Sequence, residues 1–145
     1  MFKTGISLFF ISAFIGCRSQ QPQTTILSRN DSTTLLLEAN QNVFLKREQI
    51  NLTFERIIED SRCPEGVQCV WDGVAAVELT VVGTFTRPQT LSLATTDLPD
   101  KSYLKTVVFN GYSIRLDALT PYPSKICADS LTRKPTAQLT IKPIK

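Results

Sequence analysis

The chain has 145 residues, of which 42% are hydrophobic and 20% charged, and its formal net charge is +3. This size suits one compact domain, and the small net charge, without a stripe of Lys and Arg interleaved with aromatic residues, excludes a nucleic-acid partner. The sequence contains no histidine, which excludes Ser-His-Asp and Cys-His catalytic machinery and removes the usual general base near neutral pH.

The first segment, residues 1–16, has the pattern of an export signal. Lys3 precedes an apolar run from Ile6 to Ile15, which matches the charged and hydrophobic regions of signal peptides. That run is too short for a transmembrane helix, since a helix needs about 20 apolar residues to cross a bilayer. We therefore expect residues 1–16 to be a signal peptide.

The four residues at the end of this run are Phe14-Ile15-Gly16-Cys17, and they resemble the lipobox of bacterial lipoproteins. By that resemblance Cys17 is acylated, begins the mature chain and anchors it in the lipid bilayer, effectively permanently when several acyl chains are buried. Arg18 stands where an aspartate signals retention in the inner membrane, so we expect an outer-membrane lipoprotein that faces the periplasm. Surface exposure stays open, and the alternative is an ordinary secretory signal with an incidental Cys17.

Residues 17–32 are predicted to be a lipidated, flexible tether. The stretch RSQQPQTTILSRNDS after Cys17 is rich in Gln, Ser and Thr and has no sustained hydrophobic period. A flexible chain of about 15 residues spans roughly 20 Å, enough to hold a small domain clear of the headgroups. The remaining residues, 33–145, form the predicted domain.

Short alternating segments run through this domain. Residues 50–58 alternate through Leu52 and Phe54, and residues 74–85 repeat the pattern, as half-buried strands do. Further candidate strands are residues 35–37, 43–45, 90–95, 104–109, 112–119 and 136–142. After residue 16, no apolar pattern with the 3.6-residue period of a helix extends over twelve or more residues.

Two turn signals indicate which of these strands are neighbours. Asn110-Gly111 separates two apolar segments and predicts a type I′ hairpin. Arg87-Pro88 separates two others, residues 74–85 and 90–95, and predicts a second hairpin, because proline belongs in a turn or at a sheet edge. Seven or eight strands with regular turns predict an all-β fold, a single antiparallel sandwich or small barrel that is immunoglobulin-like or a similar Greek key.

The densest group of chemically distinctive residues is EDSRCPEGVQCVWDG, residues 59–73. Cys63 and Cys69 enclose a short ring containing proline and glycine, and disulfides persist in exported proteins. The spacing excludes a CxxC redox pair, and without histidine a zinc or copper site lacks ligands. We expect a structural disulfide between Cys63 and Cys69, with Cys127 left as a buried free thiol, although three pairings are formally possible.

The carboxylates of this stretch leave one alternative open. Glu59, Asp60, Glu65 and Asp72 are hard oxygen ligands that could bind calcium, although their spacing does not match an EF-hand. We expect instead that Asp60 accepts hydrogen bonds from loop amides and that Arg62 pairs with one of the other acids. No metal or other cofactor is part of the main hypothesis.

Trp71, the only tryptophan, directly follows the predicted ring. We expect it to pack in the core beside the disulfide. An exposed tryptophan on an ordered loop would instead be a binding hot spot.

The motif from Glu59 to Gly73, together with Pro121-Tyr122-Pro123, resembles a family of small uncharacterised bacterial lipoproteins and exported proteins. The resemblance covers roughly residues 43–142 and implies a β-rich domain without an assigned activity. In that family a small residue is expected where Asp72 stands, and Cys127 looks like an addition.

The sequence also contains neither a P-loop nor a GxGxxG nucleotide-binding loop. Together with the lipobox and the absence of histidine, this predicts a membrane-anchored, non-catalytic domain. Its partner would be an envelope protein or another envelope component. The contact surface would be a loop that includes Asp60, Arg62, Glu65, Trp71 and Asp72, or else an exposed sheet edge. The alternative hypothesis is a carrier of a small ligand or of calcium.

Overall fold

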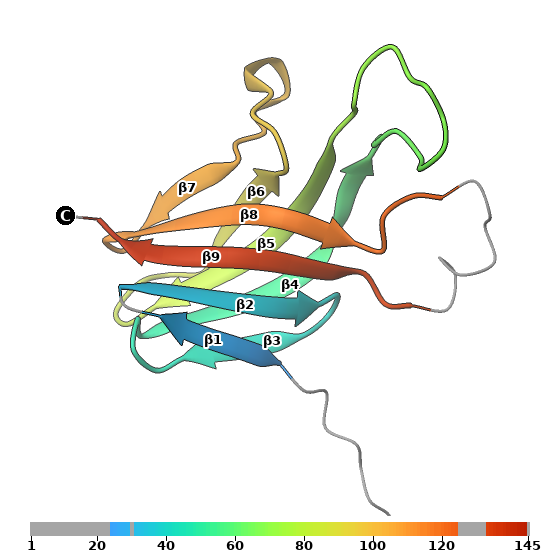
Figure 1. The fold of residues 1–145 in the computed structure, drawn as a ribbon. Coiled ribbons are helices and arrows are strands. Elements are labelled where there is room, and N and C mark those ends of the chain that lie inside the picture. Colours follow the sequence, from blue (N-terminus) through green and yellow to red (C-terminus); the bar gives the residue numbers. More distant parts are fainter. Residues whose placement is uncertain (1–23, 30, 125–132, 145) are drawn as a thin grey trace, which may run out of the picture.

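The computed structural model describes residues 24–29, 31–124 and 133–144, and these form an all-β domain (Figure 1). The fold class predicted from sequence is confirmed. The strands are β1 (Thr25–Arg29), β2 (Ser32–Glu38), β3 (Asn42–Leu45), β4 (Ile50–Asp60), β5 (Ala75–Gly83), β6 (Gln89–Ala94), β7 (Thr106–Phe109), β8 (Tyr112–Thr120) and β9 (Thr136–Pro143). A single 3-10 turn, Pro99–Lys101, is the only helical element of the described residues.

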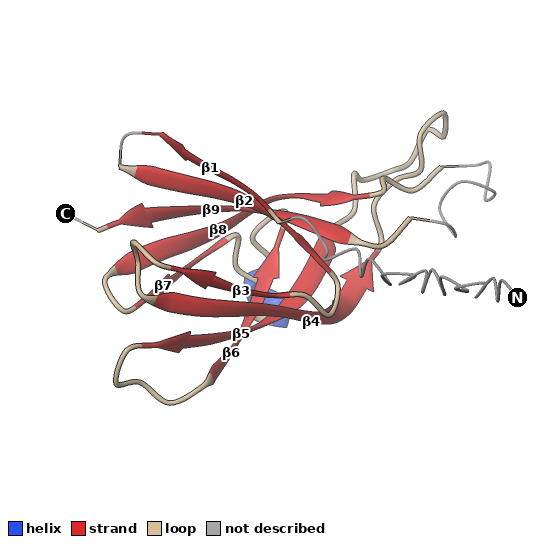
Figure 2. Ribbon diagram, turned by 90° about the horizontal axis from the view of Figure 1, so that it is seen from below, coloured by secondary structure: helices blue, strands red, loops and turns tan. Residues whose placement is uncertain are grey.

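The strands form two antiparallel sheets that face each other (Figure 2). The five-stranded sheet has the order β1-β2-β9-β8-β7, and the four-stranded sheet is the meander β3-β4-β5-β6. The chain crosses between the sheets after β2 and again after β6. The last strand, β9, lies between β2 and β8 and so closes the larger sheet.

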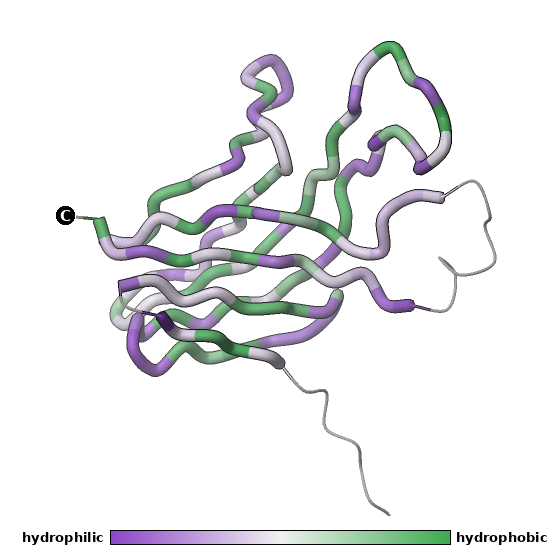
Figure 3. Tube along the Cα trace, in the orientation of Figure 1, coloured by the Kyte–Doolittle hydropathy of each residue, from purple (hydrophilic) through white to green (hydrophobic). Residues whose placement is uncertain are grey.

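The core lies between the sheets and is built by the alternation seen in the sequence (Figure 3). In β4 the side chains of Ile50, Leu52 and Phe54 are fully buried, whereas Asn51 and Thr53 between them are only partly buried. Successive side chains of a strand point to opposite faces, so one face of each strand fills the core. Burying a large apolar side chain contributes about 1.5–3 kcal/mol to the stability of the folded state.

A second, smaller cluster covers the other face of the four-stranded sheet. Ala76 and Ala94 are fully buried there, although an outward face would normally be solvated. Leu98 and Tyr103, from the connection between β6 and β7, pack over them. The start of β5 is therefore buried on both faces, which fixes where the preceding loop ends.

Both predicted hairpins are confirmed. β7 pairs with β8 across Asn110 and Gly111, whose φ angles of 48° and 79° are the positive values that a type I′ turn needs. β5 pairs with β6, and Pro88 lies in the connection between them. The two turns lie at the same end of the sandwich (Figure 1).

One segment differs from expectation. Thr25–Arg29, which we expected within the flexible tether, form the edge strand β1 against β2. All five side chains are exposed, so the segment has no buried face and leaves no alternating pattern in the sequence. The described residues therefore contain nine strands, one more than the upper predicted number.

The signal segment 1–16 and Cys17 lie outside the described residues, as does Cys127. In the part of the chain that the structure covers, no helix is both long and apolar enough to span a bilayer.

Candidate binding loop and adjacent groove

The loop of residues 61–74 connects β4 to β5 and projects from one end of the sandwich (Figure 1). Its base continues the strand pairing, because the Ser61 amide donates to the Val74 carbonyl at 2.8 Å and the Cys63 amide donates to the Asp72 carbonyl at 2.9 Å. The base of the loop is therefore a rigid stem of two paired segments. These backbone hydrogen bonds hold the two sides of the stem together.

The predicted disulfide closes the tip of the loop. Cys63 and Cys69 are bonded, and their Cα atoms are 5.9 Å apart. Within the ring the Val67 amide donates to the Pro64 carbonyl at 3.2 Å, and Gly66 supplies a φ of 73°. Proline and glycine thus produce the reversal that brings the two cysteines together.

Gly73 is required by the close approach of the two sides of the stem. Its φ is 72°, and a Cβ placed on it would lie 1.9 Å from the Ser61 carbonyl oxygen. No larger residue fits this position without separating the two sides of the stem. The glycine that ends the sequence motif of residues 59–73 therefore has a structural cause.

Arg62 joins the base of the loop to the end of β8. Its guanidinium donates to both carboxylate oxygens of Asp60, at 2.7 Å from Nε and 2.6 Å from Nη2. It also donates to the carbonyl oxygens of Leu119 and Pro121, and it stacks on the ring of Tyr122 at 4.7 Å. Arg62 is only 8% exposed, so its charge is buried with nearly all of its donors satisfied.

A second contact aligns the loop with the segment that follows β8. The Glu65 amide donates to the Pro123 carbonyl at 3.0 Å, and Glu65 forms a parallel bridge with Ser124. The two parts of the motif, around Cys63 and around Tyr122, therefore meet in space. Both parts are recognisable in the sequence, but their contact is not. The only signals for it are an arginine beside a cysteine and a distant aromatic residue flanked by prolines.

The prediction for Asp60 is confirmed, and the prediction for Arg62 is not. The Arg62 amide does donate to Asp60 Oδ1, at 3.4 Å, as expected for an aspartate that accepts from loop amides. The prediction that Arg62 pairs with a different acid is wrong, because its side chain folds back onto Asp60. This folding lets the same guanidinium reach the carbonyls at the end of β8.

The prediction that Trp71 packs in the core is also wrong. Trp71 is 55% exposed, and the neighbouring Val70 is fully exposed. Val67, in the disulfide ring, is exposed as well. The cause is that the stem ends at the hydrogen bond between Cys63 and Asp72, so Val70 and Trp71 lie at the tip of the loop, beyond the strands.

Glu59 is held by a lysine from another loop. Lys101 Nζ donates to its two carboxylate oxygens at 2.9 Å and 2.7 Å. This hydrogen bond lowers the pKa of the Glu59 carboxyl and raises the pKa of the Lys101 ammonium. The pair ties the end of β4 to the connection that covers the smaller cluster.

The four carboxylates considered for calcium are not brought together as one ligand set. Glu59 pairs with Lys101 and Asp60 with Arg62. Among the residues that the structure describes, no group of three or more Asp, Glu, His or Cys residues could hold a metal ion. Glu65 and Asp72 are exposed on the loop and form no ion pair with any described residue.

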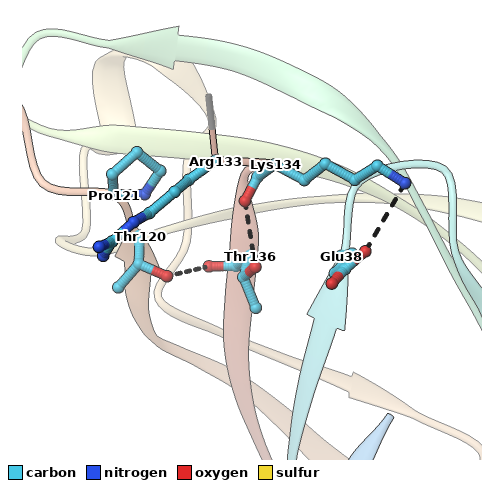
Figure 4. Close-up of a pocket in the computed structure, with 6 residues that line it drawn as sticks. All are labelled: Glu38, Thr120, Pro121, Arg133, Lys134 and Thr136. Carbon is cyan, nitrogen blue, oxygen red and sulfur yellow. Dashed lines mark hydrogen bonds and ion pairs between the residues drawn. The ribbon is translucent and has the colours of Figure 1, made fainter. Parts of the chain in front are cut away.

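Two concavities lie beside the loop base, at the same end of the sandwich. The larger has a volume of about 780 Å³ and a mostly apolar lining. The smaller, of about 330 Å³, lies where Lys134 reaches toward Glu38 at 3.8 Å (Figure 4). Thr120, Pro121 and Arg133 line both, so the two concavities meet at these residues.

In comparisons with known proteins, no protein-family model matches the chain, and neither a curated protein nor a solved structure shows significant similarity to it. The resemblance of the cysteine motif to small exported bacterial proteins therefore stays a prediction.

Proposed function

We propose that this protein is a bacterial outer-membrane lipoprotein, anchored through acylated Cys17 and facing the periplasm. Its β-sandwich is a non-catalytic binding domain for another component of the cell envelope, and the loop of residues 61–74 makes the contact. The observation that carries this proposal is the exposure of Trp71 on a loop braced by a disulfide.

The physical argument rests on what such a loop contributes to binding. Tryptophan offers a large apolar area and few rotatable bonds, so it dominates binding energy when a partner covers it. Val70 adds apolar surface beside it, and the stem hydrogen bonds and the disulfide already hold the backbone. Little conformational entropy is then lost on binding.

The charges beside the apolar tip define the partner. Glu65 and Asp72 flank it with carboxylates that no described cation neutralises. The complementary surface is an apolar pocket with Lys or Arg at its rim, on a protein of the envelope. Complementary charge of this kind gives specificity and speeds association.

The experiment places a photo-crosslinking amino acid at Val70 in living cells. We expect one discrete crosslinked product, and Trp71→Ala in the same chain reduces it at least tenfold while the melting temperature of the domain stays unchanged. Phe85→Ala is the matched control, since Phe85 is a fully exposed aromatic residue in the turn at the opposite end of β5. Crosslinking that Trp71→Ala leaves intact, or that Phe85→Ala removes equally, would refute the loop as the contact.

The anchor has its own test. Radiolabelled palmitate is expected to label the wild-type protein in cells, and Cys17→Ser is expected to abolish the label. Globomycin, which blocks lipoprotein signal cleavage, should cause the unprocessed chain to accumulate. Labelling that persists in Cys17→Ser would contradict lipidation at this residue.

A further inference from the structure

The larger concavity has the character of a ligand site. Its volume of about 780 Å³ lies within the usual range for small-molecule pockets, roughly 300–1,000 Å³. Its apolar walls come from the second half of β4, the end of β8, the segment that follows β8 and the segment that precedes β9. They are Ile57, Leu119, Pro121, Tyr122, Pro123 and Pro135.

The walls offer a ligand few backbone hydrogen bonds. Three of the lining residues are prolines and have no amide donor. The carbonyl oxygens of Leu119 and Pro121 already accept from Arg62, and the carbonyl oxygen of Pro123 accepts from the Glu65 amide. A peptide main chain would therefore lose hydrogen bonds on entering the groove, whereas a hydrocarbon chain would lose none.

Among the described residues that line the groove, one carries a charge that no other described residue compensates. Asp60 also lines the groove, but its charge is neutralised by Arg62. Arg133 is exposed and forms no ion pair with any described residue. Its side chain extends beside Pro121 toward Thr120, where the two concavities meet (Figure 4).

We propose that this groove binds a medium-chain fatty acid, or a similar monoacyl carboxylate, with the hydrocarbon chain along the proline-rich wall and the carboxylate on the guanidinium of Arg133. Arginine presents paired donors that match the two oxygens of a carboxylate. The apolar area of the chain supplies affinity, and the ion pair sets the orientation. This inference does not rest on the proposed role of Trp71, because the groove shares no lining residue with the tip of the loop.

The test measures binding by isothermal titration calorimetry to the mature chain, residues 17–145, carrying Cys17→Ser, so that neither the signal peptide nor an acyl chain of its own competes for the groove. The ligands are decanoate, decanol and decyltrimethylammonium, which share a hydrocarbon chain and differ in head-group charge. We expect decanoate to bind about tenfold or more tightly than the other two, as a hydrogen bond to a charged group implies.

Substitutions then assign the charge. Arg133→Gln is expected to remove the preference for decanoate, and Arg133→Glu to shift it toward decyltrimethylammonium. Arg87→Gln is the matched control, since Arg87 is an exposed arginine in the turn at the other end of the sandwich. Because Arg133 is exposed, these variants are expected to keep the melting temperature of the parent.

Three results would overturn the proposal: no measurable binding of decanoate, equal affinity for decanoate and decanol, or an Arg133→Gln variant that keeps the preference. A peptide with an apolar C-terminal residue that binds more tightly than decanoate would overturn the assigned ligand class. The crosslinking experiment at Val70 can fail without any of these results, so the two proposals are separately testable.

Discussion

Arg62 and Asp60, two residues apart in the sequence, form a two-point ion pair at the base of the cysteine loop. The remaining donors of the guanidinium are directed to the carbonyl oxygens of Leu119 and Pro121 at the end of β8. One side chain therefore connects the two sheets at the end that carries the loop. We conclude that Arg62 fixes the position of the loop on the sandwich, and that its loss would loosen both.

The first prediction concerns this arginine. Arg62→Met leaves the Asp60 carboxylate without its cation and takes the Arg62 donors from two carbonyl oxygens, and removal of one member of a buried pair costs about 3 kcal/mol. Urea unfolding followed by circular dichroism should show a loss of that size. Arg62→Lys should recover little of it, because an ammonium cannot form the two-point contact.

A double-mutant cycle provides the control for this prediction. Asp60→Asn alone should destabilise the protein less than Arg62→Met, since Asp60 is on the more exposed side of the pair. In the double variant the two losses should not add, because each removes the same interaction. Strict additivity would show that the pair is not coupled.

The second prediction concerns the disulfide. Replacing both Cys63 and Cys69 by serine releases a small ring, which in the loop-entropy account lowers the free energy of unfolding by about 2.4 kcal/mol. Chemical denaturation of the oxidised protein and of this variant measures the difference. A loss below about 0.5 kcal/mol would show that the stem hydrogen bonds alone set the stability of the loop.

The strands could be predicted from sequence because their burial alternates. Over most of their length β4 and β5 bury one face against the core, and a period of two residues records this directly. β1 could not be predicted, because all of its side chains are exposed and backbone pairing with β2 is its only requirement. Pairing at a sheet edge places no constraint on hydrophobic pattern.

The residues of the candidate site could be predicted from the sequence, but their exposure and most of their contacts could not. Cys63 and Cys69 could be paired from their spacing, because a short ring with proline and glycine has few conformations. The exposure of Trp71 depends on where the stem opens, and the partners of Arg62 depend on the end of β8, 57 residues away. Contacts between such distant segments leave no local pattern in a single sequence.

The third prediction concerns Gly73. Gly73→Ala places a methyl group against the Ser61 carbonyl, so the stem must separate, and we expect a loss of more than about 3 kcal/mol. Gly66→Ala is the matched control: Gly66 has nearly the same φ and open space around it. It should cost only about 1 kcal/mol, the penalty of the left-handed conformation alone. Equal losses would show that backbone conformation, and not the close approach, requires Gly73.

The fourth prediction concerns the pH dependence contributed by Glu59 and Lys101. The pKa of Glu59 is lowered in the folded protein, so its contribution to stability is present above the ordinary value of 4.5 and is lost as the pH falls through the lowered value. The pKa of Lys101 is raised, so its contribution is present below 10.5 and is lost as the pH rises through the raised value. The pair should therefore stabilise the domain across the neutral range and at neither extreme.

Melting curves of the wild type and of Glu59→Gln, recorded from acid to alkaline pH, check this. We expect a small difference in melting temperature near neutrality, because the pair is solvent-exposed and partly screened. The difference should vanish on the acid side below 4.5 and on the alkaline side above 10.5. Arg56→Gln serves as the control, since it breaks the exposed pair with Glu78 on the same sheet and leaves the Glu59 profile unchanged. A constant difference at every pH would mean that Glu59 stabilises the domain through packing rather than through its charge.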